Sequence, residues 1–151
     1  MKSILAAAAI AAVLPCAALA AVPVKHFAPA NNGPSGPAPP FSSAVQAGDT
    51  LYIGGSADAI DPATGKLPAD AKTGAKVVMD IIKKTVETAG YTMNDMVWVQ
   101  IFASDAKYLS DFNEAYKTYF TGPMPARAFI GAGPLVNGSH FQVMGIAVKS
   151  K

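Results

Sequence analysis

The sequence predicts an α+β domain in which a mixed sheet of five to six strands has two helices on one face. The first observation is the order of its patterns. Between residues 41 and 148, stretches typical of strands and helices follow one another as strand, strand, helix, strand, helix, strand, strand. The second observation is residues 96–103, a strand that is largely apolar on both faces. Two helices can cover only one face of such a sheet, so the bare apolar face predicts that the chain oligomerises.

The first two predicted strands form a hairpin. Residues 41–45 and 50–53 are rich in apolar residues, and the turn between them contains Gly48, which can adopt a positive φ. We expect the second strand to end at Gly54 and Gly55, because glycine weakens a strand interior.

Two aspartates follow this hairpin. Asp58 and Asp61 lie close enough in the chain to raise the question of a metal site or an acid–base pair. However, no third candidate ligand lies near them, and Asp-Pro-Ala-Thr-Gly-Lys at 61–66 has ordinary turn chemistry. We therefore interpret them as turn residues and expect no metal and no cofactor.

Apolar residues at helical spacing predict the two helices. The first covers residues 71–89 and is followed by Gly90, a natural C-cap. The second covers residues 107–120, and Asn113 lies beside its apolar side. Between the helices, strand 96–103 is expected to alternate, with Val97, Val99, Ile101 and Ala103 on one face and Met96, Trp98, Gln100 and Phe102 on the other.

The strand after the second helix contains Arg127, the only arginine of the chain. A guanidinium presents a planar fork of donors that matches a carboxylate or phosphate with two parallel hydrogen bonds. The simpler interpretation of a lone arginine is a structural ion pair or a solvated side chain. A turn at Asn137-Gly138 then leads to the last predicted strand, residues 141–148.

Residues 1–20 have the features of a signal peptide. Lys2 precedes an apolar stretch too short to span a bilayer, and Ala-Leu-Ala at 18–20 matches a cleavage signal. The proline before Cys16 argues against a lipid-attachment site, and cleavage would remove this only cysteine. We therefore expect a periplasmic or secreted protein with no membrane attachment after cleavage.

Residues 21–36 are expected to form a flexible, proline-containing tail in which His26 is solvated, and residues 37–151 to form the domain. The formal net charge is only +2. A nucleic-acid-binding domain normally has a basic stripe, so the sequence predicts no nucleic-acid partner.

Five short motifs occur in order along the chain. They are Pro-Phe-Ser-Ser-Ala-Val at 40–45, Leu-Tyr-Ile-Gly-Gly at 51–55, Asp-Pro-Ala-Thr-Gly at 61–65, Phe-Asn-Glu-Ala-Tyr at 112–116 and Pro-Ala-Arg at 125–127. No single motif is decisive, but together, at these spacings, they resemble the reactive intermediate deaminase family (Rid or YjgF-type, RidA-like proteins). The resemblance covers residues 37–148.

This resemblance implies a chorismate-mutase-like fold assembled as a homotrimer, with ligand pockets between subunits. In the family, the arginine of Pro-Ala-Arg binds the carboxylate of a 2-imino acid. A water molecule polarised by a glutamate of the last strand then attacks the imine carbon, and ammonia leaves. Carried over to this sequence, Arg127 clamps the carboxylate of a small 2-imino or 2-oxo acid, and Asn113 and the backbone near Gly54 and Gly55 line the pocket.

The chain departs from the family pattern at several of these positions. Phe41 replaces a tyrosine, Gly54 replaces a serine, and Phe129 replaces a small residue or cysteine. Gln142 occupies the position of the glutamate, and a glutamine can hydrogen-bond a water molecule but cannot accept its proton. Two hypotheses follow. The chain is an imine or enamine deaminase whose pocket admits apolar groups beside Phe41 and Phe129, or it is a non-catalytic, carboxylate-binding or chaperone-like trimer that has lost the chemistry.

Overall fold

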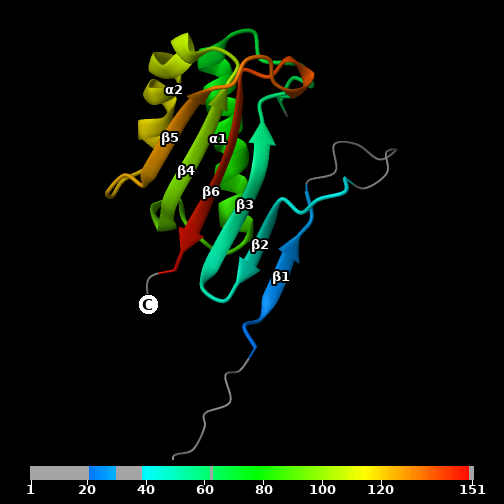
Figure 1. Cartoon of the computed structure of the whole chain (residues 1–151), viewed down its shortest axis with the longest axis vertical. Coiled ribbons are helices and arrows are strands. Elements are labelled where there is room, and N and C mark those ends of the chain that lie inside the picture. Colours follow the sequence, from blue (N-terminus) through cyan, green and yellow to red (C-terminus); the bar gives the residue numbers. More distant parts are fainter. Residues whose placement is uncertain (1–20, 30–38, 62, 150–151) are drawn as a thin grey trace, which may run out of the picture.

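The computed structural model describes residues 21–29, 39–61 and 63–149, and six strands form a single mixed sheet in the order β1-β2-β3-β6-β4-β5 (Figure 1). Only β4 and β5 pair in parallel, and the other neighbouring strands are antiparallel. This arrangement confirms the predicted α+β class. The strands are β1 (Val24–Phe27), β2 (Ala44–Ala47), β3 (Thr50–Ala57), β4 (Met96–Ala103), β5 (Ala126–Gly131) and β6 (Phe141–Val148).

Both α-helices, α1 (Ala71–Thr88) and α2 (Leu109–Tyr116), lie on the same face of the sheet (Figure 1). The carboxylate of Asp70 caps α1 by accepting a hydrogen bond from the backbone N–H of Thr73 at 2.7 Å. The second predicted helix is shorter than expected, because both of its ends tighten into 3-10 turns. The two turns that flank α2 are η2 (Ala106–Tyr108) and η3 (Lys117–Tyr119). Two further 3-10 turns, η1 (Met93–Asp95) and η4 (Val136–Gly138), precede β4 and β6.

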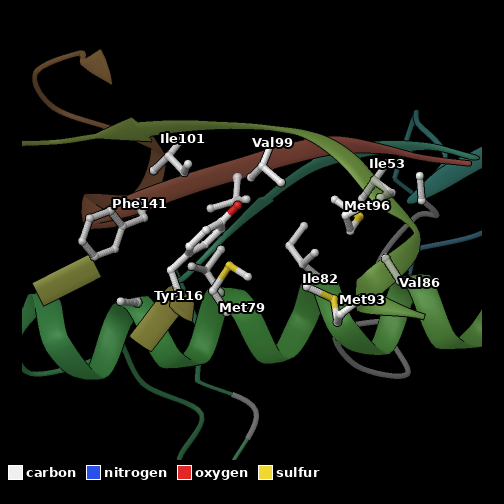
Figure 2. Close-up of a cluster of buried hydrophobic side chains, with 14 of the residues drawn as sticks. Ile53, Met79, Ile82, Val86, Met93, Met96, Val99, Ile101, Tyr116 and Phe141 are labelled. Atoms are coloured by element: carbon white, nitrogen blue, oxygen red, sulfur yellow. The ribbon is translucent and has the colours of Figure 1, made fainter. Parts of the chain in front are cut away.

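The hydrophobic core lies between the helices and the sheet. Figure 2 shows Ile53, Val99 and Ile101 of the sheet pointing toward α1, whose Ile82 and Val86 point back. All five side chains are buried. Each such burial contributes about 1.5–3 kcal/mol to the stability of the fold. This core keeps the helices packed against the strands that carry the candidate site.

The alternation predicted for β4 fails at its first residues. The register shifts between Met96 and Trp98, so that Met96 is only 4% exposed on the helix side, whereas Val97 is 47% exposed. On the neighbouring strand β6, the irregular stretch of β4 comes close to the backbone of Gly145. A Cβ at residue 145 would lie 2.7 Å from the carbonyl oxygen of Trp98, so a residue with a side chain would not fit there. Such a bulge places one extra residue in a strand and reverses the side chains that precede it.

The expectation that residues 21–36 are only a flexible tail is wrong for Val24–Phe27, which form β1 at the edge of the sheet. This strand pairs with β2 and buries Phe27. The sequence signal was weak, since the strand is short and its other side chains are exposed. The predicted leader, residues 1–20, and part of the predicted tail lie outside the described residues.

The face of the sheet opposite the helices, called here the open face, is not covered by any element of the described residues (Figure 1). Trp98, Gln100 and Phe102 of β4 lie on it and are half-buried, and Tyr52 of β3 is 52% exposed. The predicted bare apolar face is therefore present. No helix within the described ranges has the length and apolarity needed to cross a membrane.

Candidate functional site

Arg127 lies on the helix-covered face, at the edge of the sheet formed by β5. Its register partner is Val99, a core residue, and paired residues of neighbouring strands share a face. Asn113 of α2 reaches the same place and accepts a hydrogen bond from Nη1 of Arg127 at 2.7 Å. The sequence-predicted pair of Arg127 and Asn113 is therefore brought together.

The guanidinium of Arg127 lies over the face of the Tyr116 ring. The Cζ atom of Arg127 lies 4.9 Å from the ring centroid, within the range of a cation–π interaction. Among the described residues no carboxylate forms a salt bridge with Arg127, and its side chain is exposed. This geometry does not fit the structural ion pair that was the simpler interpretation of the arginine. We call Arg127, Asn113 and Tyr116 the arginine group.

Tyr116 is itself unusual, because its hydroxyl is buried without a hydrogen-bond partner among the described residues. The residue is only 4% exposed, and the hydroxyl lies in the layer between the helices and the sheet (Figure 2). Burial raises the pKa of the hydroxyl to about 12, and the positive charge of Arg127 partly offsets the rise. The phenol is therefore neutral at physiological pH and presents its ring to Arg127.

Phe129 anchors the strand that positions the arginine. Its ring packs against Phe112 of α2 at a centroid distance of 5.9 Å and against Phe141 of β6 at 6.5 Å. The structure thus places Phe129 in the aromatic part of the core, half-buried beside it. Its observed contacts keep β5 against α2, which holds Arg127 within reach of Asn113.

Gln142 lies on the open face, because its neighbours Phe141 and Val143 both point into the core. Its side chain covers Gly55 of β3. A Cβ at Gly55 would lie 3.3 Å from the Cδ atom of Gln142 and would collide with its amide nitrogen. The absence of a side chain at residue 55 therefore makes room for the glutamine amide.

Gly54 has a different reason to be glycine. Its N–H donates to the carbonyl oxygen of Ser43 at 2.8 Å, and a Cβ here would lie 2.9 Å from the carbonyl oxygen of Ser42. Any side chain at this position, including the serine that the resemblance led us to expect, would push against backbone. Phe41 directly precedes this segment and is 60% exposed. We call Phe41, Gly54, Gly55 and Gln142 the glutamine group.

The two groups lie on opposite faces of the sheet within one chain. Arg127 and Asn113 stand between the sheet edge and α2, whereas Gln142 stands over Gly55 on the open face. A small molecule bound to the guanidinium of one copy therefore cannot at the same time contact Gln142 of that copy. Within one chain the predicted site residues therefore form two separate groups.

Sequence analysis missed one polar cluster, the pair formed by Asp58 and His140. Asp58 is fully buried, with Oδ2 at 2.8 Å from Nδ1 of His140 and Oδ1 accepting from the backbone N–H of Phe141 at 2.8 Å. Asp61, by contrast, behaves as predicted, since it caps its own turn by accepting from the N–H of Ala63. The described residues contain no group of three ligands that could hold a metal ion.

Comparison with known proteins decides the family. The family model described as Endoribonuclease L-PSP matches residues 33–149. The chain belongs to this family. Its relatives include a RutC family protein of Pyrococcus horikoshii, 34% identical over 114 residues that span 75% of this chain and 90% of the relative. They also include the 2-iminobutanoate/2-iminopropanoate deaminase of Mus musculus, 35% identical over 111 residues that span 73% of this chain and 82% of the relative.

Solved structures of family members have the same fold. RidA from an Antarctic Psychrobacter superimposes with a TM-score of 0.72 at 28% identity, covering 83% of this chain and all of that one. Escherichia coli TdcF, solved with bound serine, gives a TM-score of 0.73 at 26% identity, covering 83% of this chain and 100% of its own. The resemblance to the Rid and YjgF-type proteins is thus confirmed, while the roles of the individual site residues stay predictions.

Proposed function

We propose that this family member is a deaminase that hydrolyses small 2-imino acids to 2-oxo acids and ammonia. The observation that supports the proposal most directly is the state of Arg127. Its guanidinium is exposed, held by Asn113 and Tyr116, and not paired with an acidic side chain of the described residues. A guanidinium in that state binds a carboxylate through two charge-assisted hydrogen bonds.

The chemistry would take place at the glutamine group. Gln142 has a carbonyl that accepts from a water molecule and an amide that donates to it, so it orients the water for attack on the imine carbon. It cannot act as a general base, a role worth typically ~10²–10⁴ in rate. Imines hydrolyse readily without help, so orientation of both partners accelerates the reaction further.

A second copy of the chain is needed to bring the two groups together. In this proposal the chain forms a homotrimer in which the open face of one copy packs near the β5 edge of the next. The half-buried apolar residues of the open face support it, because a contiguous apolar patch on a protein surface is typical of an interaction site. Arg127 of one copy and Gln142 of its neighbour then line one intersubunit pocket. The bound serine of Escherichia coli TdcF shows that a structural neighbour binds a small amino acid.

A non-catalytic trimer that only binds small carboxylates is the second candidate. Phe41 and Gln142 favour it, because Phe41 lacks the tyrosine hydroxyl and Gln142 lacks the water-polarising carboxylate that the resemblance led us to expect at these positions. Gly54 favours it as well, because the backbone around residue 54 leaves no room for the serine that the resemblance led us to expect there.

One measurement separates the two candidates. Freshly generated 2-iminobutanoate is offered to the purified chain, and ammonia release is compared with the uncatalysed rate and with the Arg127→Ala variant. Release above background that the variant loses supports the deaminase. Binding of 2-oxobutanoate without any acceleration overturns it in favour of the carboxylate-binding trimer.

We also propose that the chain is exported and matures by cleavage after Ala20. The support is the sequence of residues 1–20 alone. The intact mass of the protein from the periplasm or medium should correspond to a chain that begins at Ala21. A lipid adduct on Cys16, or a full-length chain that stays in the cytoplasm, would contradict this proposal.

A further inference from the structure

We infer that Asp58 and His140 position Gln142, the residue to which the proposed function assigns the orientation of the attacking water. This inference rests on the proposed deaminase function and adds two positioning residues to it. The carboxylate of Asp58 holds the two residues that lead into Gln142. Its Oδ1 accepts from the backbone N–H of Phe141 at 2.8 Å, and its Oδ2 lies 2.8 Å from Nδ1 of His140.

The backbone of Asp58 adds a third contact to the same residue. Its N–H donates to the carbonyl oxygen of Phe141 at 3.3 Å, so both backbone groups of Phe141 are bound to Asp58. The next pair along the ladder is Ala57 with Gln142 itself. Asp58 therefore acts one register position away from Gln142. Because side chains alternate along a strand, its carboxylate lies beside Phe141 on the helix-covered face, whereas Gln142 points to the open face.

Strand β3 is irregular just before Asp58. Ile53 is paired with Gly145 and Ser56 with Val143, so β3 has one residue more than β6 between these two pairs. The extra residue falls in the Gly-Gly segment 54–55, where the backbone is least restricted. A slip of one residue beyond this bulge would reverse the faces of the β3 side chains and would take Asp58 away from Phe141. The contacts of Asp58 therefore exist in one register only.

Helix α1 closes over the pair of Asp58 and His140. A Cβ at Gly74, in the first turn of this helix, would collide with Oδ2 of Asp58 and would lie 3.1 Å from Nδ1 of His140. On another side, the ring of Tyr108 lies edge-on to the imidazole at a centroid distance of 5.8 Å. Asp58 is fully buried, and the side chain of His140 is 16% exposed. The surrounding elements thus hold both side chains in place.

Stability alone does not explain a buried carboxylate at residue 58. Burying a charge costs free energy that its partners only offset, and well-packed apolar residues are often as stable in such places. A carboxylate adds direction, because its two oxygens bind their partners at defined angles, here at residues 140 and 141. The role needs no change of charge on His140, since Nδ1 carries a proton in one neutral tautomer and in the imidazolium alike.

The directional contacts of Asp58 end at the residue that the proposed chemistry uses. With Phe141 fixed, the amide of Gln142 lies over Gly55, where a side chain would collide with it. Arg127, by contrast, is paired with Val99 on β4 and held by Asn113, so none of its contacts involves the pair. Loss of the Asp58 contacts should therefore slow the chemistry and leave carboxylate binding as it is.

The test compares two quantities, the rate of ammonia release from saturating, freshly generated 2-iminobutanoate and the affinity for 2-oxobutanoate. Asp58→Val should lower the rate about tenfold or more with unchanged affinity, because small displacements of a positioned group are costly in rate. Asp58→Asn should keep the rate, since its amide oxygen still accepts from Phe141 and its NH₂ group donates to Nδ1 of His140. Ile101→Ala, a destabilising substitution in the same core, should also keep it.

Amide hydrogen exchange tests the positioning without any activity. In Asp58→Val, the backbone N–H groups of residues 141–143 should exchange faster, while those of residues 99–101 keep their protection. His140→Leu removes only one of the two partners of the carboxylate, so it should give a smaller change in both exchange and rate. This variant decides the question where Asp58→Val does not fold. Unchanged exchange at residues 141–143 in the folded variants would overturn the inference.

The outcomes also separate this inference from the proposed function. If the unaltered chain releases no ammonia above background, the deaminase proposal fails, and the catalytic meaning of the pair fails with it. If the chain is active and Asp58→Val and His140→Leu keep the full rate, only the positioning role fails. It fails as well if Asp58→Asn or Ile101→Ala loses as much rate as Asp58→Val. A rate lost in Asp58→Val, kept in Asp58→Asn and accompanied by unchanged affinity supports both.

Discussion

The two faces of the sheet differ in what covers them: the helices cover one face, and no element of the described residues covers the other. Strand β4 has side chains on both faces. On β4, Val99 and Ile101 are buried under the helices, whereas Trp98 and Phe102 on the open face are only half-buried. The arginine group belongs to the covered face and the glutamine group to the open one. The proposed function therefore assigns ligand binding to one face and chemistry to the other, and the two should respond to different substitutions.

The largest expected effect comes from placing a charge on the open face. Phe102→Glu should convert the proposed trimer to monomers and abolish ammonia release, because a carboxylate would be buried without a partner between copies. Sedimentation at micromolar concentration measures the assembly. Ile101→Ala, one residue away on the covered face, should lower the free energy of unfolding by about 2–5 kcal/mol and leave the trimer assembled. A monomeric unaltered chain would disprove the intersubunit pocket.

The next effect concerns the arginine group. Arg127→Ala should weaken binding of 2-oxobutanoate at least about 10²-fold, since it removes two charge-assisted hydrogen bonds worth about 1.5–3 kcal/mol each. Arg127→Lys should also bind poorly, because a point charge does not replace the planar fork. Isothermal titration calorimetry measures both, with Lys117→Ala as a control at the end of α2. Undiminished binding in Arg127→Ala would return the arginine to a structural role.

A smaller effect is expected at the glutamine group. Gln142→Glu should raise the rate of imine hydrolysis by about tenfold or more without tightening 2-oxobutanoate binding, because a general base acts on the transition state. Gln100→Glu, on the same face of the neighbouring strand, is the matched control and should not accelerate the reaction. If the new carboxylate instead pairs with Arg127 of an adjacent copy, binding weakens, so rate and affinity must be measured on the same variant.

The smallest effect is a pH dependence at Tyr116. Burial raises the pKa of this phenol to about 12, whereas an unfolded tyrosine ionises near pH 10. The unfolded chain therefore loses its proton first, and this contribution to stability is present below about pH 10 and is lost as pH rises to about 12. Arg127→Ala should raise the pKa further, because the guanidinium lowers it. Ultraviolet absorbance of the phenolate measures the titration, with Tyr116→Phe as the reference; a titration near 10 would show the hydroxyl to be solvated.

The sequence by itself determined the features that depend on neighbours along the chain. Periodicity predicted α1 and the alternation of β4 from Trp98 onward, but not which face of β4 the helices cover. A capping aspartate and a following glycine mark the ends of α1. The motif around Arg127 led to the prediction that Arg127 and Asn113 share a site, and the structure brings the two side chains together; the binding of a carboxylate there stays a prediction. These signals are local, because helical spacing and turn chemistry act over a few residues.

Only the tertiary structure decided what depends on distant pairing. The partners Asp58 and His140 are separated by 82 positions in the chain, and no local pattern links them. The edge strand β1, the bulge at Met96 and the contact between Ser42 and Gly54 likewise exist because strands pair in one register. That register also sets Arg127 and Gln142 on opposite faces, since side chains alternate along a strand and a shift of one residue would reverse them.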